Sequence, residues 1–214
     1  MKLKTIKNQS GQGLLELVVA IGVITVGLFS VWNLFLSNFN GEQEAGARIL
    51  AVNLAREGLE MVKNIRDSNW LAIENNETCF YEDMSNDPCR WDSGLDDDGS
   101  GLIKNIFSDN AYLDYLIDDI TDDQSRLYID SNSGFYSHNP GQPTIYRRLI
   151  TMQNVCCFDA DSNLKCDDFN FTIIEIPCPA ENLKIGLDVK STVRWTLKGQ
   201  IREITVSDRL FNWK

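Results

Sequence analysis

Residues 17–36 form a run without one charged side chain, and this run constrains the fold of the 214-residue chain more than any other feature. A helix of roughly 20 apolar residues, rising 1.5 Å per residue, matches the roughly 30 Å hydrocarbon core of a bilayer. Lys2, Lys4 and Lys7 precede the run, and basic residues beside a span stay in the cytoplasm. The sequence therefore predicts a helix that spans the membrane at about residues 14–36, with the remainder of the chain outside the cytoplasm.

Glu16 stands at the start of this span. A carboxylate costs several kcal/mol in hydrocarbon, so an acid at this depth is a functional hypothesis by default. A plain membrane anchor gives Glu16 no role. A cleaved secretory signal has a shorter apolar core, of about 7–15 residues, and a small-residue exit, whereas Leu-Phe-Leu-Ser-Asn-Phe follows here at residues 34–39. Anchor and signal stay open as alternatives, but neither explains the acid.

The junction Gly11-Gln12-Gly13-Leu14-Leu15-Glu16 resembles the cleavage and methylation signature of type IV prepilins. In that family a glycine ends a short basic leader, a glutamate stands at the fifth position after the cut, and an apolar helix follows. The resemblance implies that prepilin peptidase cuts between Gly11 and Gln12 and that Glu16 takes the glutamate position. This chain departs from the family at Gln12, where phenylalanine is usual.

A cut at this junction has a physical consequence for Glu16. It creates an amine on Gln12, one helical turn away, and in a filament Glu16 of one subunit can meet the amine of its neighbour. Desolvation cancels much of the Coulomb energy of such a buried pair. We therefore expect the pair to set the register between neighbouring subunits during assembly rather than to add net stability. The resemblance also implies the partners: other pilin subunits, the inner-membrane pilus assembly machinery, and membrane lipid before assembly.

The end of the chain carries a second resemblance. Residues 193–195 (Val-Arg-Trp), 204–206 (Ile-Thr-Val) and 210–213 (Leu-Phe-Asn-Trp) are similar to the closing hairpin of minor pilins of the type IV pilus modification family, and residues 55–60 and 65–70 resemble their helix exit. The resemblance implies an α+β fold, in which the outer half of one long helix packs on a mainly antiparallel sheet. The expected division is a leader at 1–11, a helix at 12–70 and an extracytoplasmic head at 71–214.

Periodicity predicts the elements of the head. An apolar stripe at helical spacing (Leu50, Leu54, Met61 and Ile65) extends the helix to about residue 66. Residues 75–101 are rich in turn formers and predict loops, and the apolar residues of 102–120 suit one or two short helices. Strands are expected at 126–130, 144–150, 169–176, 187–195 and 201–206, the last two joined as a hairpin across residues 198–200.

Cysteines in a segment expected outside the cytoplasm indicate disulfides. The six are Cys79, Cys89, Cys156, Cys157, Cys166 and Cys178. The first two lie close together and far from the others, so we expect them to pair. Two pairings of the others stay open: Cys156–Cys166 with Cys157–Cys178, or Cys156–Cys178 with Cys157–Cys166. A four-cysteine zinc site is the rival, but it usually needs cysteines two to four residues apart, and none of these spacings supplies that.

One loop fits a calcium ligand pattern. Asp96, Asp98 and Ser100 occupy positions 1, 3 and 5 of an EF-hand loop, with Gly101 at position 6. Phe107 stands at position 12, where the motif needs a bidentate glutamate, and a second acidic segment at 159–163 lacks the glycine. An acidic, solvated surface loop is the simpler interpretation, so calcium is the one cofactor hypothesis and no other cofactor is expected.

Charge and histidine content argue against other functions. The formal net charge is −11, which repels phosphate backbones, so we expect no nucleic acid on the bulk of the head surface. Basic pairs such as Arg147-Arg148, or Lys198 with Arg202, are expected on solvated strand faces. His138 is the only histidine and is expected in a solvated turn. Without a Gly-x-Ser-x-Gly elbow or a catalytic constellation, we expect no enzyme.

The sequence thus favours a minor type IV pilin or pilin-like structural subunit. It would be a single-pass membrane protein with a cytoplasmic N-terminus, and would reach the pilus or cell surface after assembly. Two alternatives remain: a single-span surface protein whose head binds a ligand, and a secretion-system pseudopilin.

Overall fold

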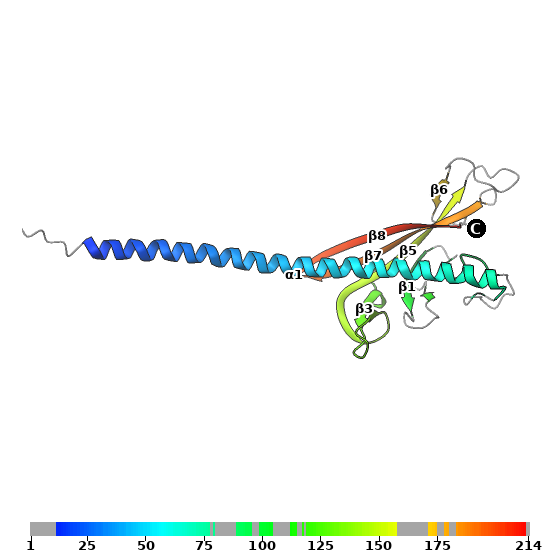
Figure 1. The fold of residues 1–214 in the computed structure, drawn as a ribbon, viewed down its shortest axis with the longest axis horizontal. Helices are drawn as coiled ribbons and strands as arrows, with labels where there is room; N and C mark the ends of the chain where they lie inside the picture. The colour runs from blue at the N-terminus through cyan, green and yellow to red at the C-terminus, as the bar shows by residue number, and fades with distance from the viewer. Residues whose placement is uncertain are drawn as a thin grey trace, which may run out of the picture. The chain divides into compact units, whose positions relative to one another are not determined.

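The computed structural model describes residues 12–77, 79, 89–95, 99–104, 112–114, 117, 119–157, 171–174, 178–179 and 183–212. The chain divides into two compact units, Met1–Ala47 and Arg48–Lys214. Helix α1 (Gln12–Asn75) runs through both, and the second unit adds the sheet (Figure 1). The strands are β1 (Gly99–Lys104), β2 (Tyr112–Asp114), β3 (Arg126–Ile129), β4 (Tyr136–Ser137), β5 (Gln142–Cys157), β6 (Phe171–Ile174), β7 (Leu183–Leu197) and β8 (Gln200–Phe211), with a 3₁₀ turn η1 (Asp123–Ser125) before β3. The predicted α+β layout with an antiparallel sheet is confirmed.

Helix α1 ends in a Schellman motif. Asn76 adopts a positive φ of 55°, its amide donates to the carbonyl of Ile73, and the amide of Glu77 donates to the carbonyl of Ala72. Asparagine tolerates the left-handed conformation better than most residues, so the Asn75-Asn76 pair is a suitable place for the helix to end. The helix therefore ends five residues beyond the predicted end at residue 70.

The face of α1 that is buried in the head confirms the predicted stripe in part. Its buried positions are Ala51, Leu54, Ala55, Gly58, Leu59, Val62 and Ile65. Of the four residues of the predicted stripe, Leu54 and Ile65 are buried, whereas Leu50 and Met61 are only half-buried. Small residues take the centre because the helix approaches the sheet closely: a Cβ added at Gly58 would lie 2.6 Å from Ser191 Oγ.

Strand β5 organises the sheet. Along one edge it pairs with β7 from Tyr146 to Cys157, and along the other it pairs in turn with β3, β1 and β6, always antiparallel. Strands β2 and β4 extend β1 and β3, and β8 extends β7. Side chains from alternate positions of β5, β7 and β8 meet α1 in the main core, which includes Leu59, Val62, Ile150, Leu187 and Val189.

The predicted hairpin is confirmed and is longer than expected. Strands β7 and β8 pair from Gly186 opposite Phe211 to Leu197 opposite Gln200. The two loop residues, Lys198 and Gly199, have φ values of 52° and 77°. Positive φ at both positions is the signature of a type I′ turn, whose twist matches that of the flanking strands.

The prediction of short helices at 102–120 is wrong for the part that the structure describes. Residues 99–104 form β1, with Ser100 opposite Thr151 of β5, and residues 112–114 form β2. The apolar residues of this segment follow neither a helical nor a strand periodicity. Their secondary structure is therefore set by pairing with β5, a strand far along the chain. Residues 105–111 lie outside the described residues.

Candidate functional site

The first candidate surface is the part of α1 in the first unit. Every side chain described between residues 13 and 39 is exposed, and the large apolar ones leave more than two-fifths of their surface open. The helix is long and apolar enough to cross a membrane, a property that it shares with signal sequences. Such a surface requires lipid or other helices around it, because water would hydrate it at a large free-energy cost.

The polar side chains within this span are satisfied by the helix itself. Thr25 Oγ1 donates to the carbonyl of Gly22 at 2.9 Å, Ser30 Oγ to that of Val26 at 2.9 Å, and Asn33 Nδ2 to that of Phe29 at 3.0 Å. In hydrocarbon a polar group must find its partner within the protein. These residues therefore fit a lipid or helix-bundle environment without a further partner.

Glu16 shares one open depression on the helix surface with the apolar side chains of Leu15, Val19 and Ala20. The helix begins at Gln12, and residues four apart lie on one face, so the Gln12 backbone nitrogen and Glu16 are neighbours along the helix. Gly11, the predicted cleavage residue, lies outside the described residues. A carboxylate on an apolar helix face is costly in hydrocarbon unless a positive charge lies beside it.

Aromatic side chains gather at the outer end of the span. The ring centroids of Trp32 and Phe35 are 6.4 Å apart, and those of Phe35 and Phe39 are 6.5 Å apart. Tryptophan is enriched where hydrocarbon meets headgroups. The cluster lies near residue 36, where the sequence predicts the end of the span.

In the second unit, Arg148 is buried beneath α1, with only 1% of its surface exposed. Its Nη1 donates to the carbonyl of Leu54 at 3.0 Å and lies 3.4 Å from Glu57 Oε1. Its Nε and Nη2 have no hydrogen-bond partner among the described residues. The prediction that Arg147-Arg148 lies on a solvated strand face is wrong for Arg148, because even-numbered positions of β5 face the helix.

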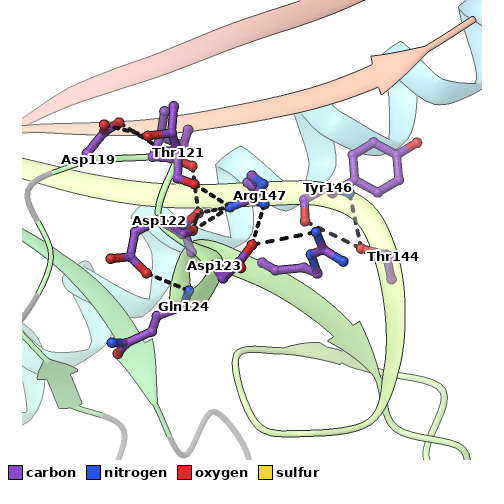
Figure 2. Close-up of polar contacts among 11 residues, drawn as sticks. Asp119, Thr121, Asp122, Asp123, Gln124, Thr144, Tyr146 and Arg147 are labelled. Carbon is purple, nitrogen blue, oxygen red and sulfur yellow. Dashed lines mark hydrogen bonds and ion pairs between the residues drawn. The ribbon is translucent and has the colours of Figure 1, made fainter. Parts of the chain in front are cut away.

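Arg147 points to the opposite face of the sheet and holds the segment before β3 (Figure 2). Its guanidinium donates to the carbonyls of Thr121 and Asp122 and, at 2.8 Å, to the Asp123 carboxylate. The hydrogen bond from Arg147 lowers the pKa of Asp123. Both arginines of the pair therefore make internal contacts, and we assign neither to ligand binding.

A buried carboxylate, Asp92, stands at the other end of the head. It is 2% exposed and pairs with Lys184 at 2.8 Å and with Arg90 at 3.1 Å. Burial by itself raises the pKa of Asp92, but the hydrogen bond from Arg90 and the charge of Lys184 more than offset it, so the pKa is lowered. Arg90, Asp92 and Lys184 thus form a structural charge cluster. The sequence gave no signal for it, because Lys184 is far from the other two residues along the chain.

Asn69 ties the end of α1 to the same region. Its Nδ2 donates to the carbonyls of Trp91 at 3.2 Å and Ser93 at 2.8 Å. Cys89 Sγ lies 3.7 Å from the Asn69 carbonyl. A buried amide with two backbone acceptors fixes the following loop on the helix, which explains why asparagine stands on its buried face.

The disulfides narrow the alternatives left by the sequence. Cys79 pairs with Cys89, as predicted, and Cys156 pairs with Cys178. The second bond excludes the alternative in which Cys156 pairs with Cys166. Cys157 is also disulfide-bonded, and Cys166 lies outside the described residues.

Two further predicted sites have different outcomes. Asp96 and Asp98 of the calcium hypothesis lie outside the described residues, as does the acidic segment 159–163, and Ser100 belongs to β1. Calcium therefore stays a prediction. The expectation that His138 is solvated is wrong: it is 9% exposed, and its Nδ1 lies 3.3 Å from the carbonyl of Arg126. A turn on one strand edge is covered by the neighbouring strand, which sequence alone does not indicate.

The chain matches no protein-family model, no curated protein and no solved structure.

Proposed function

We propose that this chain is a structural subunit of a type IV pilus or a related filament, in the manner of a minor pilin. In this proposal prepilin peptidase removes residues 1–11 at the cytoplasmic face of the membrane. The mature chain waits in the bilayer through the apolar half of α1, with its head outside the cytoplasm. It then joins the filament when helices of neighbouring subunits cover that apolar surface.

One observation carries the proposal: a single carboxylate, Glu16, on the otherwise uncharged and exposed segment 13–39 of α1, one turn from the backbone nitrogen of Gln12. A plain anchor has no use for that charge, and hydrocarbon penalises it. A cut before Gln12 supplies an amine at the same depth on every copy. Glu16 of one subunit and the amine of the next can then neutralise each other, which sets the axial register of the two helices.

The mature N-terminus tests the proposal directly. The protein is purified from native envelopes and its N-terminal peptide is sequenced by mass spectrometry. We expect Gln12 as the first residue, and we expect Gly11→Val to keep residues 1–11 because the cut needs a small residue before it. Recovery of the intact start from the unsubstituted protein contradicts the proposal and favours a plain single-span protein.

Glu16 tests assembly separately from processing. Glu16→Gln keeps the size and removes the charge, so we expect normal cleavage and membrane insertion but loss of the subunit from sheared filaments. Glu42→Gln is the matched control, because it neutralises another exposed acid of α1 outside the span. Normal incorporation of Glu16→Gln would remove the basis for the proposed pairing.

Two other functions are compatible with the same N-terminal sequence. A secretion-system pseudopilin shares both the cut and Glu16, so the filament from which the subunit is recovered separates it from a pilin. A surface protein with a ligand-binding head keeps its leader and never polymerises, so the N-terminal sequence separates it from both.

A further inference from the structure

The residue that follows the proposed cut is a glutamine. Gln12 is the first residue of α1, and Gly13 and Leu14 after it are exposed. Removal of residues 1–11 turns the backbone nitrogen of Gln12 into a free amine. An N-terminal glutamine carries, on its own side chain, an amide carbon at the position that closes a lactam ring with that amine. The cut therefore creates a reactivity that the phenylalanine usual at this position in type IV prepilins does not have.

The helix leaves the Gln12 nitrogen available for such a reaction. The first four N–H groups of an α-helix have no acceptor within the helix, and the Gln12 nitrogen is the first of them in α1. A ring closed at that nitrogen resembles a proline at the first helical position, which helices accept well because no hydrogen bond is lost there. Ring closure at Gln12 is therefore compatible with the helix as it stands.

The charge on the amine decides whether the ring can close. An ammonium has no free electron pair, so only the neutral amine attacks a carbonyl carbon. An α-amine in water titrates within about one pH unit of neutrality, so a part of it is neutral in the cell. An opposite charge within about 4–6 Å favours the protonated form by about one pKa unit or more, which lowers the neutral fraction about tenfold or more.

Glu16 is the only charged side chain among residues 13–39, so it is the only group in this part of α1 that can hold the amine protonated. Within one chain it does so weakly. Glu16 is exposed and belongs to an open depression, and a pair four residues apart on an open helix surface shifts an equilibrium only about twofold. Strong protection requires a carboxylate in a site closed to water, which the partner subunit's Glu16 provides in the proposed filament.

We propose that Gln12 is a site of self-modification: in a processed copy that stays unassembled, its amine closes on its own side-chain amide and forms pyroglutamate. The amine nitrogen attacks Cδ, the N–Cδ bond forms and the Cδ–Nε2 bond breaks. One amine proton goes to the leaving nitrogen, which departs as ammonia, and no group is oxidised or reduced. The inference rests on the proposed function, because only the cut before Gln12 supplies the amine.

Ring closure separates the mature chain into two pools. Pyroglutamate carries no charge, so a cyclised copy cannot neutralise the partner subunit's Glu16. A copy that joins the filament soon after cleavage keeps its ammonium, because the pairing removes the neutral amine that would react. A copy that waits in the bilayer loses the charge. Gln12 thus limits the time for which a processed copy remains able to assemble.

Pulse–chase labelling with mass spectrometry of the N-terminal peptide tests the proposal. Sheared filaments and the remaining membranes are separated, and each is dissolved in denaturant with an amine-acylating reagent. The reagent caps every free amine and so prevents ring closure during handling. We expect the membrane pool to accumulate, during the chase, an uncapped Gln12 peptide that is lighter by one ammonia. We expect the cyclised fraction in filaments to be about tenfold lower or less, the effect of the paired charge.

Gln12→Met is the matched control, because methionine has a side chain of similar length without an amide carbon. We expect its N-terminal peptide to be capped in both pools at every time of the chase. A Gln12 peptide that stays capped or is methylated in the membrane pool, or equal cyclised fractions in the two pools, overturns the proposal. Recovery of residues 1–11 on the protein overturns the proposed function and this inference with it. The two failures are distinguishable, because the leader gives a peptide of different sequence.

Discussion

Arg148 places a positive charge inside the head, where burial lowers the pKa of its guanidinium and Glu57 opposes that shift. Glu57 is partly exposed and lies 3.4 Å away, so it compensates the buried charge only in part. Replacing a buried ion pair by apolar side chains is often neutral or stabilising, whereas removing one partner leaves an uncompensated charge. At the scale of single residues, Arg148 is therefore more suited to fixing how α1 lies on the sheet than to stabilising the head.

We expect Arg148→Met and Glu57→Gln to change the free energy of unfolding in opposite directions. We expect Arg148→Met to raise the free energy of unfolding of the full chain in detergent by about 1 kcal/mol or more, because the unpartnered Nε and Nη2 disappear. We expect Glu57→Gln to lower it by about 1 kcal/mol, a value reduced by solvent screening. Urea unfolding followed by tryptophan fluorescence measures both. A destabilised Arg148→Met protein would mean that the guanidinium contributes net stability.

Asp92 predicts a pH dependence. Its pKa in the folded head is lowered from the usual 3.8, so the folded state binds fewer protons than the unfolded state near that pH. Its contribution to stability is therefore complete above about pH 4–5 and is lost as the pH falls through the folded-state pKa. Asp92→Asn should flatten the loss of stability between neutral and acidic pH in urea titrations. An identical acid profile for Asp92→Asn and the unsubstituted protein would show that other carboxylates control it.

At the scale of elements, the packing of α1 on β7 depends on Gly58. Ser191 Oγ occupies the place where a side chain at residue 58 would begin, and it has no hydrogen-bond partner among the described residues. The small residues on this helix face thus determine how closely the helix and sheet approach.

A double-mutant cycle tests this contact. We expect Gly58→Ala to destabilise the chain by about 1–3 kcal/mol through overpacking, despite the better helix propensity of alanine. Ser191→Ala alone should be nearly neutral, because the hydroxyl is unpartnered, and it should restore much of the stability of Gly58→Ala. Additive effects of the two substitutions, measured by urea unfolding, would show that the two positions do not contact each other.

At the scale of the whole molecule, disulfides hold the loop-rich parts of the head. Cys79–Cys89 and Cys156–Cys178 close segments with sequence separations of 10 and 22 residues. Such bonds form and persist in oxidising compartments.

Loss of the longer disulfide loop should cost more stability. We expect Cys156→Ala with Cys178→Ala to lower the free energy of unfolding by about 3 kcal/mol, and Cys79→Ala with Cys89→Ala by somewhat less, because loop entropy grows slowly with length. Urea midpoints of the full chain under oxidising conditions compare the two. The reverse order would show that strain or packing, and not loop length, decides their effects.

Local signals were sufficient for much of the fold. The apolar run, the alternation in β7 and β8, and the Lys198-Gly199 turn each specify a structure over a few neighbouring residues, and each was predicted. The half-burial of Leu50 and Met61, the strands at 99–104 and 112–114, the burial of His138 and Arg148, and the Asp92 cluster were wrong or missed. Each of these depends on which segments, far apart in sequence, come into contact.

The sequence by itself determined that one helix can span a membrane, that Glu16 lies on it, and that the head is an antiparallel sheet with disulfides. These properties follow from hydrophobic transfer, helix geometry and strand periodicity, which act within a short window of the chain. Only the tertiary structure decided the pairing of Cys156 with Cys178, the close approach at Gly58 and the opposite directions of β6 and β8. Those features arise when the long strand β5 brings distant segments to its two edges, and no local pattern encodes that choice.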